Sequence, residues 1–343
     1  MRGLRRDEAW HPCWIVNGVQ AWIVFQRTRH FTPAFRAWDE VDAKAAIAEI
    51  AADAVSIVDP TTLWPAHPMD DGVRDGHGSL YFGAAGVIWA LDYLRREQVI
   101  SDAHDPTPLT TTVLERNAPW FATTAYSIHA SLLMGELGIL LVQMRVAPHQ
   151  GLADEIYTLL ASNSELPIVE LMWGLPGCML GCIHMRTMTH DDRFMDLFRL
   201  QSTRLLADLE MDDNGPIWTQ DLYGRRQRWL GPVHGFAGNM VPLLHGWAWL
   251  TPEQRAIVSA AVPRTLAAHA VSSDQGINWP AIVPNNQALA LCQHCRRRGD
   301  GDDVRRRALH YTRVRGLASA RGRTDLERWA ARQRVEPLPW DRR

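Results

Sequence analysis

Three short stretches of the chain carry residue types that could do chemistry. The run CQHC places the thiols of Cys292 and Cys295 beside the imidazole of His294, and these side chains are common zinc ligands. In GPVHGFAG, His234 directly precedes a glycine, and imidazole is suited to proton transfer near neutral pH. Glu170 precedes Gly174 by four residues, a place where an acidic side chain often caps a helix. We therefore ask which elements would have to bring these groups together.

Four glycine turns supply the strongest pattern for such elements. Each combines an approach segment, a G-x-x-G turn and an apolar run: GSLYFGAAGVIWAL, SLLMGELGILLVQM, ELMWGLPGCMLGCI and GPVHGFAGNMVPLL. The first glycines (Gly83, Gly135, Gly174 and Gly235) are 52, 39 and 61 residues apart, which leaves room for two helices per interval. This spacing predicts repeated helical hairpins whose inner helices start side by side at one rim. Helix N-terminal N–H groups would then face that rim, where they favour an anion or carboxylate.

The intervening sequence favours the same all-α class. Residues 40–59 place Val41, Ile47, Ile50 and Val55 near one helical face, and Pro60 follows. Strand-like alternation with tight turns is scarce. We expect a ring of antiparallel helix pairs.

Charge is distributed unevenly along the 343 residues. The net charge is −2, but residues 296–343 carry 15 arginines, no lysine and seven acids, whereas residues 1–295 carry 21 basic and 31 acidic residues. Such a tail is typical of nucleic-acid binding or of a solvated charged helix. In the rest of the chain basic and aromatic residues do not interleave, so nucleic-acid binding is not expected there. No apolar run is long enough to span a membrane, and residues 13–25 lack a convincing cleavage site, so we expect a cytoplasmic protein.

The ordered turns, above all WGLPG followed by HGFAG, resemble those of the lanthionine synthetase C-like family over roughly residues 30–295. The segment DPTTLWPAHPMDDG, which leads into the first turn, is similar to the entry region of stand-alone bacterial members. The resemblance implies an α/α toroid, a six-hairpin-like barrel, around a central zinc ion. It also implies addition of a peptide cysteine or glutathione thiol to a dehydrated serine or threonine. An upstream dehydratase or kinase is a possible partner.

The resemblance assigns roles to individual residues. It implies that His234 is catalytic, that Glu170 lies near the active site, and that Cys295 is the first zinc cysteine. Trp173, Gly174 and Gly235 would lie against the substrate. A thiol with a pKa of about 8.5 is deprotonated by zinc, which needs three protein ligands and one open position. Cys178 and Cys182, one helical turn apart, are interpreted as small core residues.

The sequence departs from the family pattern directly after Cys295. The family continues with His-Gly and later supplies a Cys-His-Gly turn, but here Arg296, Arg297 and Arg298 follow. Loss of two bases from the histidine codon of a GC-rich gene would produce this arginine run, and the alternative frame of the last residues permits a Cys-His-Gly. Three interpretations stay open: a frameshift, an authentic basic tail, and a metal site formed by Cys292, His294 and Cys295. The expected division is an N-terminal extension (1–29), an incomplete toroid (30–295) and a basic tail (296–343).

Two other functions compete with the resemblance. A six-hairpin glycoside hydrolase shares the toroid but needs two facing carboxylates, for which Asp75, Glu136 and Glu170 are the nearest candidates. A non-catalytic remnant or binding shell is the other possibility. Because only Cys295 remains of the family ligand set, we expect poor zinc binding and impaired catalysis.

Overall fold

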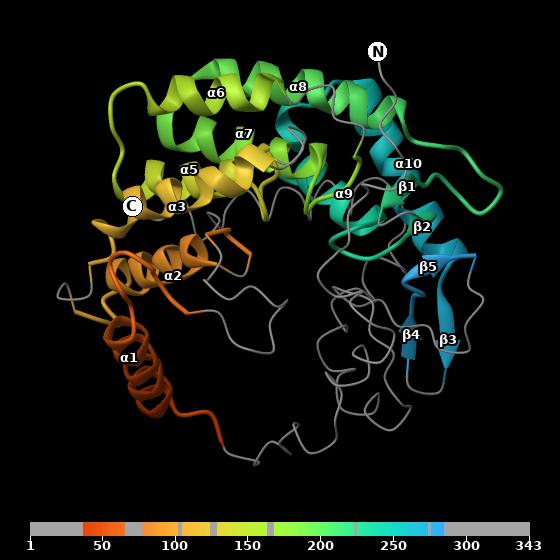
Figure 1. The fold of residues 1–343 in the computed structure, drawn as a ribbon. Coiled ribbons are helices and arrows are strands. Elements are labelled where there is room, and N and C mark those ends of the chain that lie inside the picture. The colour runs from red at the N-terminus through yellow and green to blue at the C-terminus, as the bar shows by residue number, and fades with distance from the viewer. Residues whose placement is uncertain are drawn as a thin grey trace.

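A computed structural model of the protein describes residues 37–65, 78–81, 83–101, 105–123, 129–162, 168–222, 225–273 and 276–284. Most of these residues are helical, which confirms the predominantly helical class. The helices are α1 (Glu40–Ser56), α2 (Ala84–Arg96), α3 (Leu109–Thr123), α5 (Glu136–Val146), α6 (Leu152–Ser162), α7 (Leu175–Thr189), α8 (Asp192–Ala207), α9 (Phe236–His245) and α10 (Pro252–Ala268), with a 3-10 turn at Trp247–Trp249. They follow an arc from α1 to α10 (Figure 1). Within the described ranges, no helix is long and apolar enough to cross a membrane.

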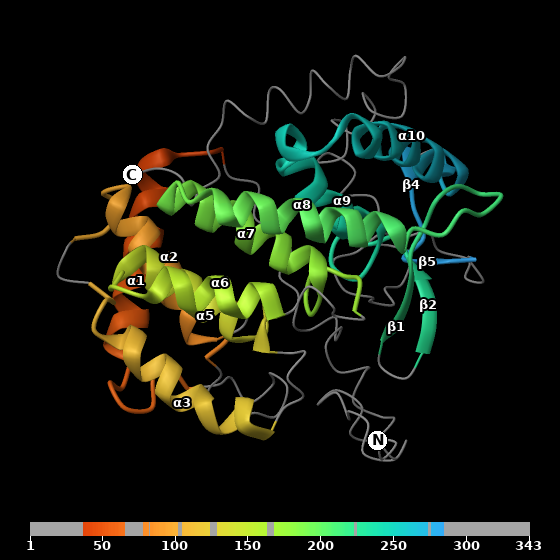
Figure 2. The same ribbon diagram turned by 90° about the horizontal axis from the view of Figure 1, so that it is seen from above.

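The helices form an inner and an outer layer. In α5 every residue from 137 to 143 is buried, and α7 is buried over most of its length. In α6 only Leu152, Ile156 and Leu160 are buried, which is a single stripe at four-residue spacing. A helix buried all round lies inside a fold, whereas a helix with one apolar stripe faces solvent on its other side. The views agree, because α6 and α8 lie over α5 and α7 (Figure 2).

Consecutive glycine turns contact one another in chain order. The Tyr81 amide in the first turn donates to a carbonyl of the second turn at 2.9 Å. Gly177 in the third turn lies against Leu132 of the second, since a Cβ at Gly177 would be 3.0 Å from the Leu132 Cβ. The Leu171 amide of the third turn donates to the Val233 carbonyl of the fourth at 3.0 Å. The expectation that the four turns lie together at the starts of α2, α5, α7 and α9 is confirmed, while closure into a toroid stays a prediction.

The second glycine of each turn is required by a close backbone approach. At Gly177 a Cβ would lie 2.5 Å from the carbonyl oxygen of Leu171, six residues earlier. At Gly238 it would collide with the carbonyl of Pro232, again six residues earlier. The same relation to the sixth preceding residue holds at Gly86 and Gly138. The repeat therefore records one local geometry used four times.

Two small β-elements were not expected from the sequence. An antiparallel sheet has the order β1 (Thr219–Leu222), β2 (Arg225–Trp229) and β5 (Ile282–Val283), and β3 (Val271–Ser273) pairs with β4 (Gly276–Asn278). The sequences TQDL and RRQRW contain few apolar residues, so they lack the period-two hydrophobic signal of a half-buried strand.

Helix α1 forms where expected, but it buries only part of its apolar surface. The helix ends at Ser56, before Pro60. Val41 is 76% exposed and Ile50 is 70% exposed, so the helix does not bury all four of these apolar residues. Only the side that carries Val55 packs against α2. Because α1 lies at the end of the arc (Figure 1), it has described neighbours on one side alone.

Candidate active site

His234 and Glu170 form a buried pair between the fourth and third glycine turns. The Nδ1 atom of His234 lies 2.6 Å from Oε2 of Glu170. Glu170 is fully buried and His234 is 7% exposed. As a carboxylate Glu170 only accepts hydrogen bonds, so His234 donates through Nδ1. The contact selects one tautomer of the imidazole and orients its ring, with Nε2 as the nitrogen that can exchange a proton.

The Glu170 carboxylate also accepts hydrogen bonds from backbone amides of the third glycine turn, to which it belongs. It accepts a hydrogen bond from the Met172 amide at 3.2 Å and a second from the Trp173 amide. Glu170 is therefore both a backbone cap and the partner of a histidine. The two interpretations that its position in the sequence left open are compatible.

Aligning the turns shows where they differ chemically. The position four residues before the first glycine is occupied by Ser79, Ser131, Glu170 and Gly231 in order along the chain. The position directly before that glycine is aromatic or apolar in the first three turns and is His234 in the fourth. Only the third and fourth turns thus bring an acid and an imidazole to neighbouring places.

The carbonyl oxygen of Val169, just before Glu170, accepts two side-chain hydrogen bonds. Asn239 in α9 donates through Nδ2 at 2.7 Å, and Gln220 in β1 donates through Nε2. Asn239 is fully buried and Gln220 is 1% exposed. The backbone that carries Glu170 is therefore tied both to the helix that follows His234 and to the sheet.

Trp229, at the end of β2, lies edge-on to His234. The two ring centroids are 6.0 Å apart with an interplanar angle of 63°. Its indole Nε1 is buried. The sheet thus places an aromatic ring beside the His234 imidazole. Its edge strand β1 carries Gln220, which donates to the Val169 carbonyl.

Sequence reasoning missed Trp229, Gln220 and Asn239. A usable signal existed only for Asn239, because the aligned positions in the other turns are apolar or weakly polar: Val87, Ile139 and Cys178. The two residues on the sheet have no equivalent in the repeat, so repetition could not reveal them.

The other residues expected near a substrate lie close to this pair. Gly174 and Gly235 are the residues that precede α7 and α9, each in extended conformation. The Trp173 side chain is partly buried and packs against a small cluster containing Met172 and Val233. Contact of these three residues with a substrate stays a prediction.

Cys178 and Cys182 are core residues, as expected. Both are fully buried, and their Sγ atoms lie 3.2 Å from the Ala130 carbonyl oxygen and 3.6 Å from Oε1 of Gln201. Burial raises the pKa of the Cys178 thiol to about 12 and raises that of Cys182 well above its ordinary value. Both thiols stay protonated at neutral pH, which makes them poor metal ligands.

The described residues do not supply a zinc ligand set. Among them, no three His, Cys, Asp or Glu side chains are grouped so that they could hold a metal ion. Cys295, Cys292 and His294 lie outside the described residues, as do the predicted extension (1–29) and basic tail (296–343). Zinc binding and the approach of Cys295 to His234 therefore stay predictions.

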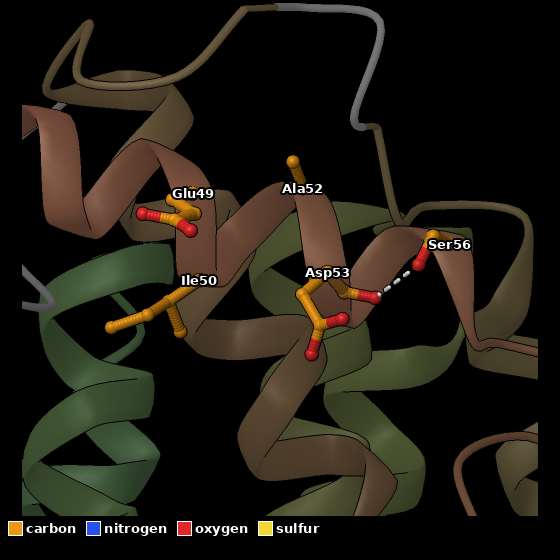
Figure 3. Close-up of a pocket in the computed structure, with 5 residues that line it drawn as sticks. All are labelled: Glu49, Ile50, Ala52, Asp53 and Ser56. Atoms are coloured by element: carbon orange, nitrogen blue, oxygen red, sulfur yellow. Dashed lines mark hydrogen bonds between the residues drawn. The ribbon is translucent and has the colours of Figure 1, made fainter.

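A separate surface hollow lies on α1. Exposed residues of this one helix line it, and the Ser56 hydroxyl donates to the Asp53 carbonyl at 2.8 Å (Figure 3). The hollow is formed by Glu49, Ile50, Ala52, Asp53 and Ser56. Because α1 is at the opposite end of the arc from α9 (Figure 1), this hollow is not part of the Glu170–His234 site.

Comparison with known proteins adds no identification to this geometry. No family model matches the chain, and no curated protein is significantly similar to it.

Proposed function

We propose that this chain is a lanthionine synthetase C-like protein. Its site would add a cysteine or glutathione thiol to a dehydroamino acid in a peptide, in the cytoplasm, with the chain as written impaired by its altered C-terminal part. The observation that carries the proposal is the Glu170–His234 pair at adjoining glycine turns. The four-turn repeat, with one glycine geometry used each time, supports it.

The chemistry explains why such a pair is useful. When the thiol sulfur adds to the β-carbon, a carbon–sulfur bond forms, the carbon–carbon π bond breaks, and an enolate results. A proton must then reach the α-carbon, so the net change is addition of one thiol. His234, held through Nδ1 by Glu170, would take up at Nε2 the proton that the thiol loses and would pass it from Nε2 to the α-carbon. In the family that the sequence resembles, a bound zinc ion would coordinate the substrate thiol and lower its pKa, so that it reacts as the thiolate.

The glycoside hydrolase alternative receives less support from the same residues. Such an enzyme needs two carboxylates flanking the scissile bond. Glu170 is fully buried and is engaged by His234 and two backbone amides, so its carboxylate does not face a substrate space. Glu136, the next candidate, is a partly exposed residue with His129 at 4.0 Å.

The test uses the chain as written beside a version in which two inserted bases restore the frame after Cys295. Each is incubated with zinc, glutathione and a peptide containing dehydrobutyrine, and the products are followed by mass spectrometry. We expect the frame-restored protein to form the glutathione adduct and the chain as written to form little. His234→Asn in the restored protein should lower the rate about 10²–10⁴-fold.

The matched control is His190→Asn. His190 follows α7 in a left-handed conformation that asparagine tolerates, so this variant should keep the full rate. A restored protein that adds neither glutathione nor a peptide cysteine to any dehydroamino acid would show the proposal to be wrong.

A further inference from the structure

We propose that Gln220 and Asn239 are positioning residues, which hold the backbone of Glu170 so that its carboxylate meets His234 at Nδ1. The role of the pair in catalysis rests on the proposed function, but the positioning itself is a property of the folded chain. Gln220 lies outside the glycine turns from which the site was inferred, and Asn239 directly follows the second glycine of the fourth turn.

The first support is the geometry at the Val169 carbonyl. A carbonyl oxygen has two lone pairs, and here both find a side-chain donor, Asn239 at 2.7 Å and Gln220 from β1. This carbonyl shares a planar peptide unit with the amide nitrogen of Glu170. Fixing the oxygen therefore fixes the plane from which the Glu170 side chain departs.

A second observation supports the proposal: the segment that carries His234 and Asn239 contacts both the side chain of Glu170 and the backbone beside it. His234 and Asn239 belong to the same turn and helix start, five residues apart in the chain. One binds the Glu170 side chain, and the other binds the backbone directly before it. A shift of α9 relative to the third turn would therefore change both contacts together.

A third observation supports the proposal: burying these two side-chain amides costs free energy that their hydrogen bonds must offset. Both side chains are almost completely buried, and a buried amide is unfavourable unless it is hydrogen bonded. Apolar or weakly polar residues fill the position of Asn239 in α2, α5 and α7, so packing alone does not require an amide there. The two amides lie on β1 and α9, and both donate to the carbonyl of Val169, directly before Glu170.

The experiment uses the full chain as written, labelled with ¹⁵N-histidine. The ring nitrogen shifts of His234, identified by their loss in His234→Gln, report which nitrogen carries the proton. Gln220→Met, Asn239→Leu and the double variant remove the donors at nearly constant volume. Glu170→Gln defines the signal of a ring that has lost its carboxylate partner.

The matched control is Gln201→Met in α8. Gln201 is also fully buried and donates to a backbone carbonyl, that of Leu160 at 3.2 Å, but it does not contact the pair. We expect the unmodified chain to show the Nδ1–H tautomer of His234 alone. The double variant should shift toward the Glu170→Gln signal, each single variant should shift part of the way, and the control should not shift.

An unchanged His234 tautomer in the double variant would overturn the proposal. If the double variant does not fold, unchanged shifts in both single variants would overturn it equally. In the frame-restored protein, the single variants should lower kcat about 10–100-fold with little change in KM. Absence of any activity in the unmodified restored protein would defeat the proposed function and leave the tautomer result standing.

Discussion

Glu170 and His234 are 64 positions apart in the chain, yet their Oε2 and Nδ1 atoms lie 2.6 Å apart in the interior. The neighbouring backbone bond from the Leu171 amide to the Val233 carbonyl brings the two turns into register. A buried carboxylate is stable only when it is paired or hydrogen bonded, so this contact links the stability of the fold to the orientation of the imidazole.

Replacing Glu170 with leucine should lower the free energy of unfolding by about 3–5 kcal/mol, because a buried histidine and two amides lose their acceptor. Urea unfolding followed by circular dichroism measures this. Glu210→Leu is the control, since its carboxylate is 38% exposed and pairs with Arg228 at the surface, and it should cost about 0–1 kcal/mol. Equal losses in the two variants would contradict a special role for the buried pair.

Gly177→Ala should destabilise the protein by about 1–3 kcal/mol, because its Cβ would press on the Leu171 backbone carbonyl. Gly181→Ala, one turn further along α7, is the matched comparison. Its Cβ would meet only the ends of side chains, Leu137 at 3.0 Å and Leu160 at 3.3 Å, which can shift. Alanine also favours the helix by about 1 kcal/mol, so this variant should be close to neutral in thermal unfolding. Similar melting temperatures for the two variants would argue against the close-approach explanation.

Cys178 and Cys182 should resist alkylation in the native protein. Both thiols are buried, and burial raises the pKa of Cys178 to about 12, so little thiolate is present at pH 8. Iodoacetamide labelling with peptide-resolved mass spectrometry should find these two cysteines unmodified before unfolding and modified after it. Rapid labelling of either one in the native state would show that the α7 core opens readily.

His184 should make the protein less stable in acid. Burial, with smaller contributions from His245 and Arg145, lowers its pKa from 6.5 to about 4 in the folded state. Unfolding then takes up a proton between these values, so the contribution of His184 is complete above pH 6.5 and is lost as the pH falls toward 4. The slope is at most about 1.4 kcal/mol per pH unit.

The measurement compares urea unfolding of the unmodified chain and His184→Gln across that pH range. Glutamine does not titrate, so the variant should show the shallower dependence on pH. Parallel curves would indicate that His184 takes up its proton as readily in the folded protein as in the unfolded chain.

The chain as written should contain much less than one zinc ion per molecule. A catalytic zinc needs three protein ligands, and of the residues that the family resemblance assigns only Cys295 is present. Metal analysis of the purified chain beside the frame-restored protein measures the difference. Equimolar zinc in the chain as written would contradict this prediction and would direct attention to Cys292 and His294.

The glycine turns illustrate what a sequence repeat can predict. The starts of α2, α5, α7 and α9 follow directly from Gly83, Gly135, Gly174 and Gly235. The glycines are local requirements of one geometry, so they are visible in a single sequence. Which apolar residues of α1 are buried was not predictable in the same way, because their burial depends on the elements that pack against the helix. Its place at the end of the arc decided that Val41 and Ile50 are exposed.

The sequence by itself determined the helical class, the helix starts and the two candidate residues, since helix propensity, capping and close backbone approach act over a few residues. Only the tertiary structure decided that Glu170 contacts His234. It also decided that Gln220 and Asn239 both donate to the Val169 carbonyl oxygen, directly before Glu170. Those contacts join a strand, a turn and a helix from distant parts of the chain. Their geometry depends on how the layers pack, which side-chain type and spacing do not specify.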